Sequence, residues 1–136
     1  MTLLVDTSVW AEFFRGQGTP SNQQFDRLIA SDPSQILSCP PVRMELSVDP
    51  NDLRRQRLLK VYDGFPTTDV VADDFDLAAE IYRATQRRGH TVRSQLDCVI
   101  AAIALRCEAI LVHNDVDFDR MVECVDTLSV LRLTGS

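Results

Sequence analysis

The sequence predicts an α/β fold with a central, mostly parallel sheet covered on both faces by helices. Short apolar runs typical of buried strands alternate with longer stretches in which apolar residues recur at helical spacing. Turn-forming residues separate these segments, as at residues 16–20 and 31–33. One stretch, residues 97–107, is apolar on nearly every side, which indicates a buried helix. Strands that alternate with helices in this way favour a parallel sheet.

The chain opens with a predicted strand at residues 2–5 that runs directly into a helix. The segment Asp6-Thr7-Ser8 follows the apolar run, and all three residue types cap helices well. Apolar side chains then recur at helical spacing over residues 9–14. A second helix, which contains Phe25, is expected to end at residues 31–33, where a proline follows an aspartate.

The middle of the chain is predicted to hold two strands and two helices. Residues 35–38 form a short strand, and Pro40 begins a helix because proline suits the first helical turn. Pro50 ends this helix. Residues 51–62 form an amphipathic helix with several solvated arginines, and a third strand is expected over residues 65–70.

The last part of the chain repeats the alternation of helix and strand. A long helix is expected over residues 73–88, and Ser94 is expected to cap the buried helix that follows. Residues 109–113 form a fourth strand. A short helix over residues 117–124 and a last strand over residues 128–131 complete the pattern.

Length and composition predict a single soluble domain over residues 1–136. The chain is 45% hydrophobic and 25% charged, as in ordinary globular proteins. No apolar run is long enough to cross a bilayer and no signal peptide is visible, so we expect a cytoplasmic protein without a membrane partner. The 4 cysteines lack Cys-x-x-Cys spacing, which makes free thiols more plausible than a zinc site. A net charge of −6 excludes a broad basic surface, so any contact with nucleic acid must use a local patch.

Four carboxylates are predicted to meet at one edge of the sheet. Asp6 follows the first predicted strand and Asp115 follows the fourth, so both lie at the carboxyl ends of strands. Helices return antiparallel to the strands and therefore begin at the same edge. Glu45 lies in the first two turns of one such helix, and Asp97 lies in the first turn of another. The crevice at this edge is where open α/β sheets bind ligands.

Each acid also has a purely structural interpretation. Asp6 and Asp115 could cap the helices that follow them, and Asp97 could complement a helix dipole. These interpretations are weaker for Glu45 and Asp97, which share helical faces with apolar residues. A buried carboxylate needs a counter-charge, and Lys60 is the only lysine of the chain. A hard divalent cation, Mg²⁺ or Mn²⁺, suits an all-oxygen set of ligands and supports hydrolysis of phosphodiesters.

Several segments together resemble the PIN-domain ribonucleases, and among them the VapC toxins of bacterial toxin-antitoxin pairs. The segments are Val5-Asp6-Thr7-Ser8, Glu45, residues 93–102, and His113-Asn114-Asp115 with Asp117 and Phe118. The resemblance implies a PIN-like three-layer α/β/α fold with a five-stranded sheet. It also implies metal-dependent endonucleolytic cleavage of RNA, either transfer or ribosomal RNA. A homodimer and a VapB-type antitoxin that blocks the site, sometimes in a larger assembly, are the implied partners.

Carried over residue by residue, the resemblance assigns roles to individual side chains. Asp6, Glu45, Asp97 and Asp115 match the catalytic and metal-binding acids of the family, and Asp117 matches a further acid at the second metal position. Ser8, and less clearly Thr7, corresponds to a hydroxyl that supports the first aspartate. The chain departs from the family after Glu45, where residues 47–50 replace a glycine-containing turn.

A local patch of cations is predicted to bind the RNA. Arg87, Arg88, His90 and Arg93 flank Gly89 just ahead of the Asp97 helix, where phosphates can dock. Arg87 and Arg88 could equally form a solvated helix end, since cations favour helix C-termini. His113 is a strand-end residue that we expect either to be structural or to contact the substrate.

Two other functions fit part of the pattern. A Mg²⁺-dependent phosphotransfer domain also gathers aspartates at a sheet edge, but it normally adds a lysine, and Lys60 lies in an amphipathic helix away from any strand end. A non-catalytic binding module could use the acidic pocket to accept an arginine from a partner. Binding of Mg²⁺ or Mn²⁺ separates the enzyme from the binding module.

Overall fold

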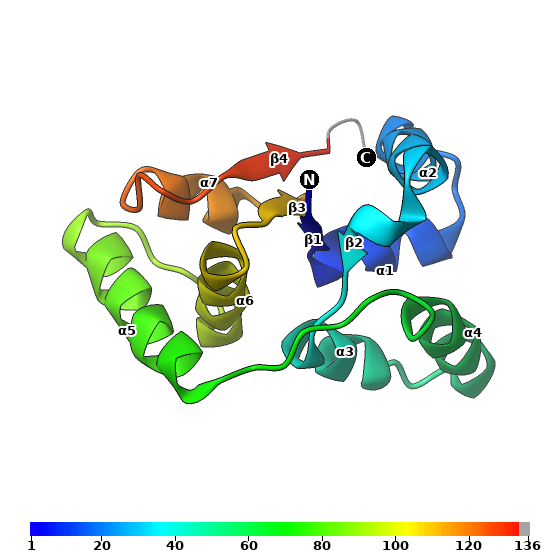
Figure 1. Cartoon of the computed structure of the whole chain (residues 1–136), viewed down its shortest axis with the longest axis horizontal. Coiled ribbons are helices and arrows are strands. Elements are labelled where there is room, and N and C mark those ends of the chain that lie inside the picture. Colours follow the sequence, from blue (N-terminus) through cyan, green and yellow to red (C-terminus); the bar gives the residue numbers. More distant parts are fainter. Residues whose placement is uncertain (134–136) are drawn as a thin grey trace.

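The computed structural model describes residues 1–133 and confirms an α/β fold around a parallel sheet (Figure 1). All seven predicted helices are present, with ends shifted by a few residues. In chain order the elements are β1 (Leu3–Val5), α1 (Thr7–Arg15), α2 (Pro20–Ser31), the short 3-10 helix η1 (Pro33–Gln35), β2 (Ile36–Leu37), α3 (Pro40–Ser47), α4 (Asp52–Tyr62), α5 (Ala72–Arg87), α6 (Gln95–Arg106), β3 (Ile110–His113), α7 (Val116–Val122) and β4 (Val130–Arg132).

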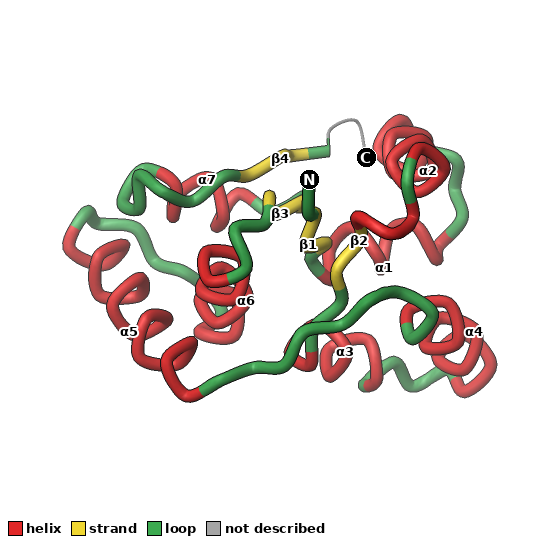
Figure 2. The backbone as a smooth tube through the Cα atoms, in the orientation of Figure 1, coloured by secondary structure: helices red, strands yellow, loops and turns green. Residues whose placement is uncertain are grey.

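The sheet has the strand order β2-β1-β3-β4, and every neighbouring pair is parallel. Leu3 of β1 lies opposite Ile36 on one side and Ile110 on the other. Figure 2 shows these short strands in yellow, with red helices on either side of β1 and β3 and with β4 at the upper edge of the molecule. Because all strands are parallel, their carboxyl ends lie at one edge of the sheet.

The prediction of a full strand over residues 65–70 is wrong. This segment makes one isolated parallel bridge, between Ser38 and Thr67. The Ser38 N–H donates to the Pro66 carbonyl at 2.8 Å, and the Thr68 N–H donates to the Ser38 carbonyl at 3.0 Å. The ladder of hydrogen bonds ends there for two reasons. Pro66 has no N–H to donate, and Pro40, on the segment paired with it, begins α3. The described part of the sheet therefore has four strands rather than five.

The helices cover the sheet in packed pairs. α6 packs beside β3, and α5 packs on α6 at the end of the molecule shown on the left of Figure 1. The pairs α1–α2 and α3–α4 lie at the opposite end, near β1 and β2. α1 and α6 both begin at the carboxyl edge of the sheet, as helices that return antiparallel to the strands must.

The core consists mainly of β1, β3 and α6. All three residues of β1 are buried, and so is the run of α6 from Cys98 to Ala104. Trp10 of α1 is fully buried, with its ring centroid 4.9 Å from that of Phe25 and 5.3 Å from that of Tyr62. Burial of the whole circumference of α6 fixes the position of its first turn, which carries Asp97.

The cysteines of the chain are free thiols, as expected. Cys39 and Cys98 are buried, and burial raises the pKa of each thiol to about 12, so both remain protonated core groups. No helix within residues 1–133 is long and apolar enough to cross a membrane.

Candidate metal centre

The junction between β1 and α1 places the first acid, Asp6. Its backbone is extended at the N-cap of α1, and its N–H donates to the Val112 carbonyl at 2.8 Å. Its Oδ2 atom accepts hydrogen bonds from the Ser8 N–H at 3.0 Å and the Ser8 hydroxyl at 2.7 Å. The other oxygen, Oδ1, is buried and has no partner. Asp6 thus caps its helix with one oxygen and leaves the second available to a ligand.

Glu45 reaches the same edge from α3. Its Oε1 atom accepts a hydrogen bond of 2.7 Å from the Thr7 hydroxyl. The resemblance assigned Ser8, and less clearly Thr7, to the support of Asp6; in the structure the Thr7 hydroxyl donates to Glu45 instead. Ser8 alone supports Asp6 through its side chain. The two consecutive hydroxyls therefore hold two different carboxylates.

Asp97 lies in the first turn of α6 and is only 9% exposed. Among the described residues its side chain has no hydrogen-bond partner and no ion pair. Burial raises the pKa of Asp97 to about 7, and the neighbouring charges of Asp6 and Glu45 add to this rise. Burial likewise raises the pKa of Asp6 to about 6, against the hydrogen bonds from Ser8, which lower it. Ser94, expected to cap α6, occupies the N-cap position but makes no capping hydrogen bond through its side chain.

Asp115 and Asp117 follow β3 on the other side of Asp97. Asp115 is the N-cap of α7, and its Oδ1 atom accepts a hydrogen bond of 3.0 Å from the Asp117 N–H. Asp117 is fully buried at the start of α7. Both carboxylates form ion pairs with Arg93. Arg93 Nη2 lies 2.7 Å from Asp115 Oδ1, and Arg93 Nε lies 3.2 Å from Asp117 Oδ2.

The structure brings all five candidate acids together in two overlapping groups. Oxygens of Asp6, Glu45 and Asp97 lie within 4.8 Å of one another, and so do oxygens of Asp97, Asp115 and Asp117. Asp97 belongs to both groups. A pocket of about 310 Å³ opens over them, lined by Asp6, Thr7, Ser8, Glu45, Arg93, Ser94, Asp97 and Asp115.

The remaining predicted site residues lie elsewhere. Arg87 lines a different groove, between α5 and the segment after α7, together with Leu77 and Cys124. Arg88 follows the end of α5 and has no described contact with the acids. His113 is fully buried, which favours its structural interpretation over contact with the substrate. Burial lowers the pKa of His113, and its Nδ1 atom accepts a hydrogen bond of 3.1 Å from the Asp115 N–H.

Sequence reasoning missed a buried carboxylate next to the site, Glu12 of α1. Glu12 is 7% exposed and accepts hydrogen bonds from the Thr19 hydroxyl at 2.9 Å and from the Asn114 amide Nδ2 at 2.7 Å. Burial raises the pKa of Glu12, but these hydrogen bonds outweigh burial and the net pKa is lowered. The Asn114 N–H also donates to the Ser8 hydroxyl oxygen at 3.0 Å. Glu12 and Asn114 therefore connect the Asp6 junction to the start of α7.

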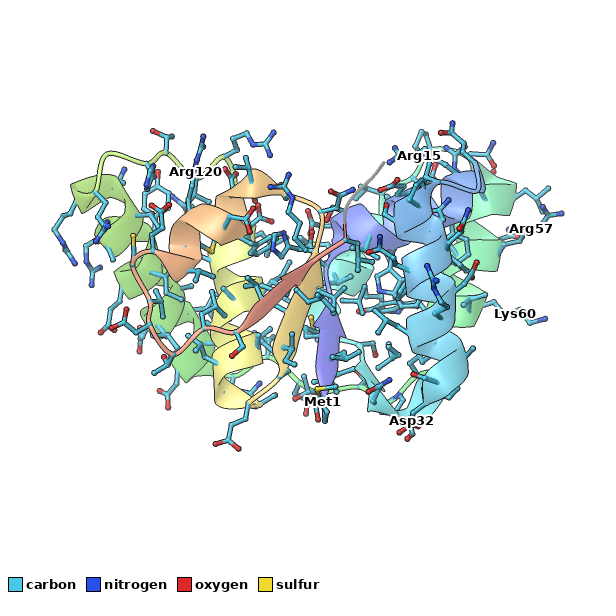
Figure 3. All side chains as sticks on the ribbon, turned by 90° about the horizontal axis from the view of Figure 1, so that it is seen from above. Met1, Arg15, Asp32, Arg57, Lys60 and Arg120 are labelled. Carbon is cyan, nitrogen blue, oxygen red and sulfur yellow. The ribbon has the colours of Figure 1, made fainter. Side chains whose placement is uncertain are left out.

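The phosphotransfer alternative lacks its lysine in the structure. Lys60 lies on α4 and points outward at the right of Figure 3, while the strands run from the edge of Met1 toward the edge where Arg120 lies. No lysine lines the acidic pocket.

Comparison with protein families adds independent information. The PIN domain family model matches residues 3–123. The chain is 44% identical over 119 residues to a VapC ribonuclease of Mycobacterium bovis and, to the same extent, to ribonuclease VapC11 of Mycobacterium tuberculosis. In both cases the match covers 86% of this chain and 89% of the relative.

Solved structures share the fold at much lower sequence identity. VapBC2 from Rickettsia felis, bound to a DNA fragment from its promoter, matches with a TM-score of 0.76 and 18% identity over 98% of this chain and 100% of that one. VapC20 from Mycobacterium tuberculosis, described as a toxin that cleaves the sarcin-ricin loop, matches with a TM-score of 0.64 and 20% identity over 87% of this chain and 93% of that one.

Proposed function

The chain belongs to the PIN domain family, and from this premise we propose that it is a VapC-type toxin that cleaves RNA endonucleolytically with the help of a divalent cation. One observation carries the proposal. Asp6, Glu45 and Asp97 lie together without any ion pair among the described residues, and the buried Asp6 Oδ1 atom has no partner. Such a group of carboxylates is unfavourable until a cation joins it.

The donor set suits Mg²⁺ or Mn²⁺ better than a softer metal. The candidate ligands are all carboxylate oxygens, and the cysteines and histidines lie outside both acidic groups. We propose that Asp6, Glu45 and Asp97 are the ligands. When bound, such an ion supplies a nucleophilic water near neutral pH and stabilises negative charge on the phosphate.

The chain's own residues hold these ligands in place. The Ser8 hydroxyl orients Asp6, and the Thr7 hydroxyl orients Glu45. The burial of α6 fixes the backbone position of Asp97. Groups that orient metal ligands typically change metal affinity or activity by about 10–100-fold when they are removed.

Substrate binding relies on the few cationic groups at the pocket. Arg93 is exposed at the mouth of the acidic pocket, where its guanidinium can donate to phosphate oxygens of RNA. The overall charge of −6 limits attraction to such local contacts. We therefore propose that Arg93, rather than Arg87 or Arg88, makes the contact with phosphate closest to the cleavage site.

The test compares cleavage of RNA by the parent chain with that of Asp97→Asn and of a matched control, Asp26→Asn, on the exposed surface of α2. We expect the parent and Asp26→Asn to cut RNA with Mg²⁺ or Mn²⁺ and to stop with EDTA, and Asp97→Asn to lose at least 100-fold in rate. Cleavage by Asp97→Asn at the parental rate refutes the assignment. Sequencing of RNA ends in cells that express the protein identifies the substrate as transfer or ribosomal RNA.

A cognate VapB-type antitoxin is the proposed partner of a cytoplasmic homodimer. A mainly apolar groove of about 370 Å³ runs from Phe14 past Val48 and Leu58, and it shares Thr7 and Glu45 with the acidic pocket. An antitoxin segment seated in this groove would end at the acids and block them.

This placement of the antitoxin is testable with two equivalent substitutions. Val48 lines the groove and is 73% exposed, whereas Val61 is 42% exposed on α4 and lies outside the groove. We expect Val48→Glu to weaken the binding of the antitoxin at least tenfold and Val61→Glu to leave it unchanged. Equal binding by both variants contradicts the proposed position of the antitoxin.

A further inference from the structure

The two acidic groups that share Asp97 differ in how their charge is compensated. In the first group, Asp6 and Glu45 accept side-chain and backbone hydrogen bonds from neutral donors, the hydroxyls of Thr7 and Ser8 and the N–H of Ser8. The side chain of Asp97 accepts no hydrogen bond among the described residues. No arginine, lysine or histidine of residues 1–133 forms an ion pair with them. This group also contains the unpartnered oxygen of Asp6.

The second group already holds cations supplied by the chain. The guanidinium of Arg93 bridges Asp115 Oδ1 at 2.7 Å and Asp117 Oδ2 at 3.2 Å. Arg120 Nη1 lies 3.5 Å from the other oxygen of Asp117. Both oxygens of Asp117 and one oxygen of Asp115 therefore face guanidinium groups.

The position of Arg93 is fixed by its own backbone as well as by charge. The Arg93 N–H donates to Asp117 Oδ2 at 3.1 Å, the same oxygen that faces its Nε atom. These two hydrogen bonds to one oxygen hold the base of the Arg93 side chain against Asp117, while the side chain as a whole remains 70% exposed. Arg93 is therefore bound to the acids while most of its side chain stays exposed to solvent.

We propose that the chain binds one divalent cation, at Asp6, Glu45 and Asp97, and that the guanidinium of Arg93 takes the place of a second cation at Asp115 and Asp117. This inference rests on the proposed function, in which the first group binds the metal. A second ion would have to bind carboxylate oxygens that already accept hydrogen bonds from guanidinium groups, and it would have to break several of these charge-assisted bonds. Like charges at this short separation also disfavour a second cation beside Arg93.

The proposal has a consequence for the reaction. In sites with two metals the second ion stabilises charge on the phosphate that is being cleaved. Here a fixed arginine at the mouth of the pocket can supply positive charge to that phosphate, and its planar donors suit two phosphate oxygens.

The experiment counts bound ions. Titration of the metal-free parent chain with Mn²⁺, followed by electron paramagnetic resonance of the free ion and by calorimetry, is expected to give one ion per chain. Arg93→Gln is expected to give two, because the positive charge and the side-chain donors that face Asp115 Oδ1 and Asp117 Oδ2 are removed. Arg57→Gln is the matched control: it removes the same charge from the exposed side of α4 (Figure 3), outside the lining of the acidic pocket, and is expected to retain one ion.

A second pair of variants locates the single ion in the parent background. Asp6→Asn is expected to abolish binding, whereas Asp115→Asn is expected to keep one ion because Asp115 is not a ligand in the first group. Circular dichroism establishes that each variant is folded before the titration.

The outcomes separate this inference from the proposed function. Two ions in the parent, one ion in Arg93→Gln, or loss of binding in Asp115→Asn overturns the role of Arg93 while the metal-dependent nuclease stands. No ion in the folded parent at millimolar Mn²⁺ overturns both.

Discussion

Replacement of Asp97 by asparagine is expected to stabilise the metal-free protein while it abolishes cleavage. Asp97 is 9% exposed, lies beside Asp6 and Glu45, and its side chain accepts no hydrogen bond among the described residues. Asparagine has the same shape and no charge, so the variant loses no contact and escapes the cost of a buried, repelled carboxylate. A residue retained for binding a cation is expected to behave in this way.

The size of the effect follows from the pKa of Asp97, which burial raises from 3.8 to about 7. At about 1.4 kcal/mol per pKa unit, ionisation in the folded, metal-free chain costs on the order of 4 kcal/mol. Below the unfolded pKa of 3.8 both states hold the proton and there is no cost. As the pH rises from about 4 to about 7, the unfolded chain releases the proton first, so the stability of the parent falls. The Asp97→Asn variant also loses the favourable interaction between a carboxylate and the helix dipole, roughly 0.5 kcal/mol, which offsets a small part of its gain in stability.

Urea denaturation in EDTA at pH 5 and pH 8 measures this difference. Asp97→Asn should exceed the parent in free energy of unfolding by a few kcal/mol at pH 8 and by less at pH 5. Addition of Mg²⁺ should stabilise the parent and leave the variant unchanged. Asp26→Asn, on the exposed face of α2, should match the parent throughout. If Asp97→Asn is less stable than the parent at pH 8 in EDTA, the carboxylate is a structural group and the argument fails.

Three further predictions concern the supports of the site and of the fold. Ser8→Ala removes the hydroxyl that donates to Asp6, so Mn²⁺ affinity measured by calorimetry should fall by about 10–100-fold, and an unchanged affinity contradicts the orienting role. Arg106→Met leaves the carboxylate of Asp74, which is 2% exposed, without its arginine. The free energy of unfolding measured in urea should fall by about 3 kcal/mol, and the cleavage rate of the folded protein should stay unchanged. Mg²⁺ at 100 times its dissociation constant should raise the free energy of unfolding by about 2.7 kcal/mol in the parent, and the absence of any shift argues against binding.

The meeting of the acids was predictable because it depends on topology. Asp6 and Asp115 follow parallel strands, Asp97 lies in the first turn of a helix that returns from the same edge, and Glu45 lies in the second turn of α3, which begins at that edge. Strand direction and helix polarity are readable from the sequence, so the edge at which each acid lies follows without knowledge of side-chain packing. The fifth strand was not predictable in the same way, because residues 65–70 carry a strand-like pattern but lose their ladder where a proline meets the end of β2.

Partners of individual side chains were beyond the sequence. Thr7 and Ser8 are adjacent, yet one hydroxyl bonds Glu45 and the other bonds Asp6. Glu12 reads as a solvated helical residue, and only the approach of Asn114, 102 positions away, gives it a buried partner. Rotamers and long-range contacts decide such pairs, and a single sequence does not encode them in a readable pattern.

The charge of the pocket explains why an external cation is still needed although arginines are abundant. Arg43 pairs with Asp63 and Arg106 pairs with Asp74, both away from the acidic pocket. Arg93 reaches the pocket, but its backbone bond to Asp117 holds it to the β3–α7 side. The acids on the opposite side of the pocket, Asp6, Glu45 and Asp97, therefore form no ion pair with any cation of residues 1–133. We propose that a metal ion is drawn to that side while Arg93 stays paired with Asp115 and Asp117 at the mouth of the pocket, so that the uneven distribution of arginine determines both where the ion binds and where the substrate is held.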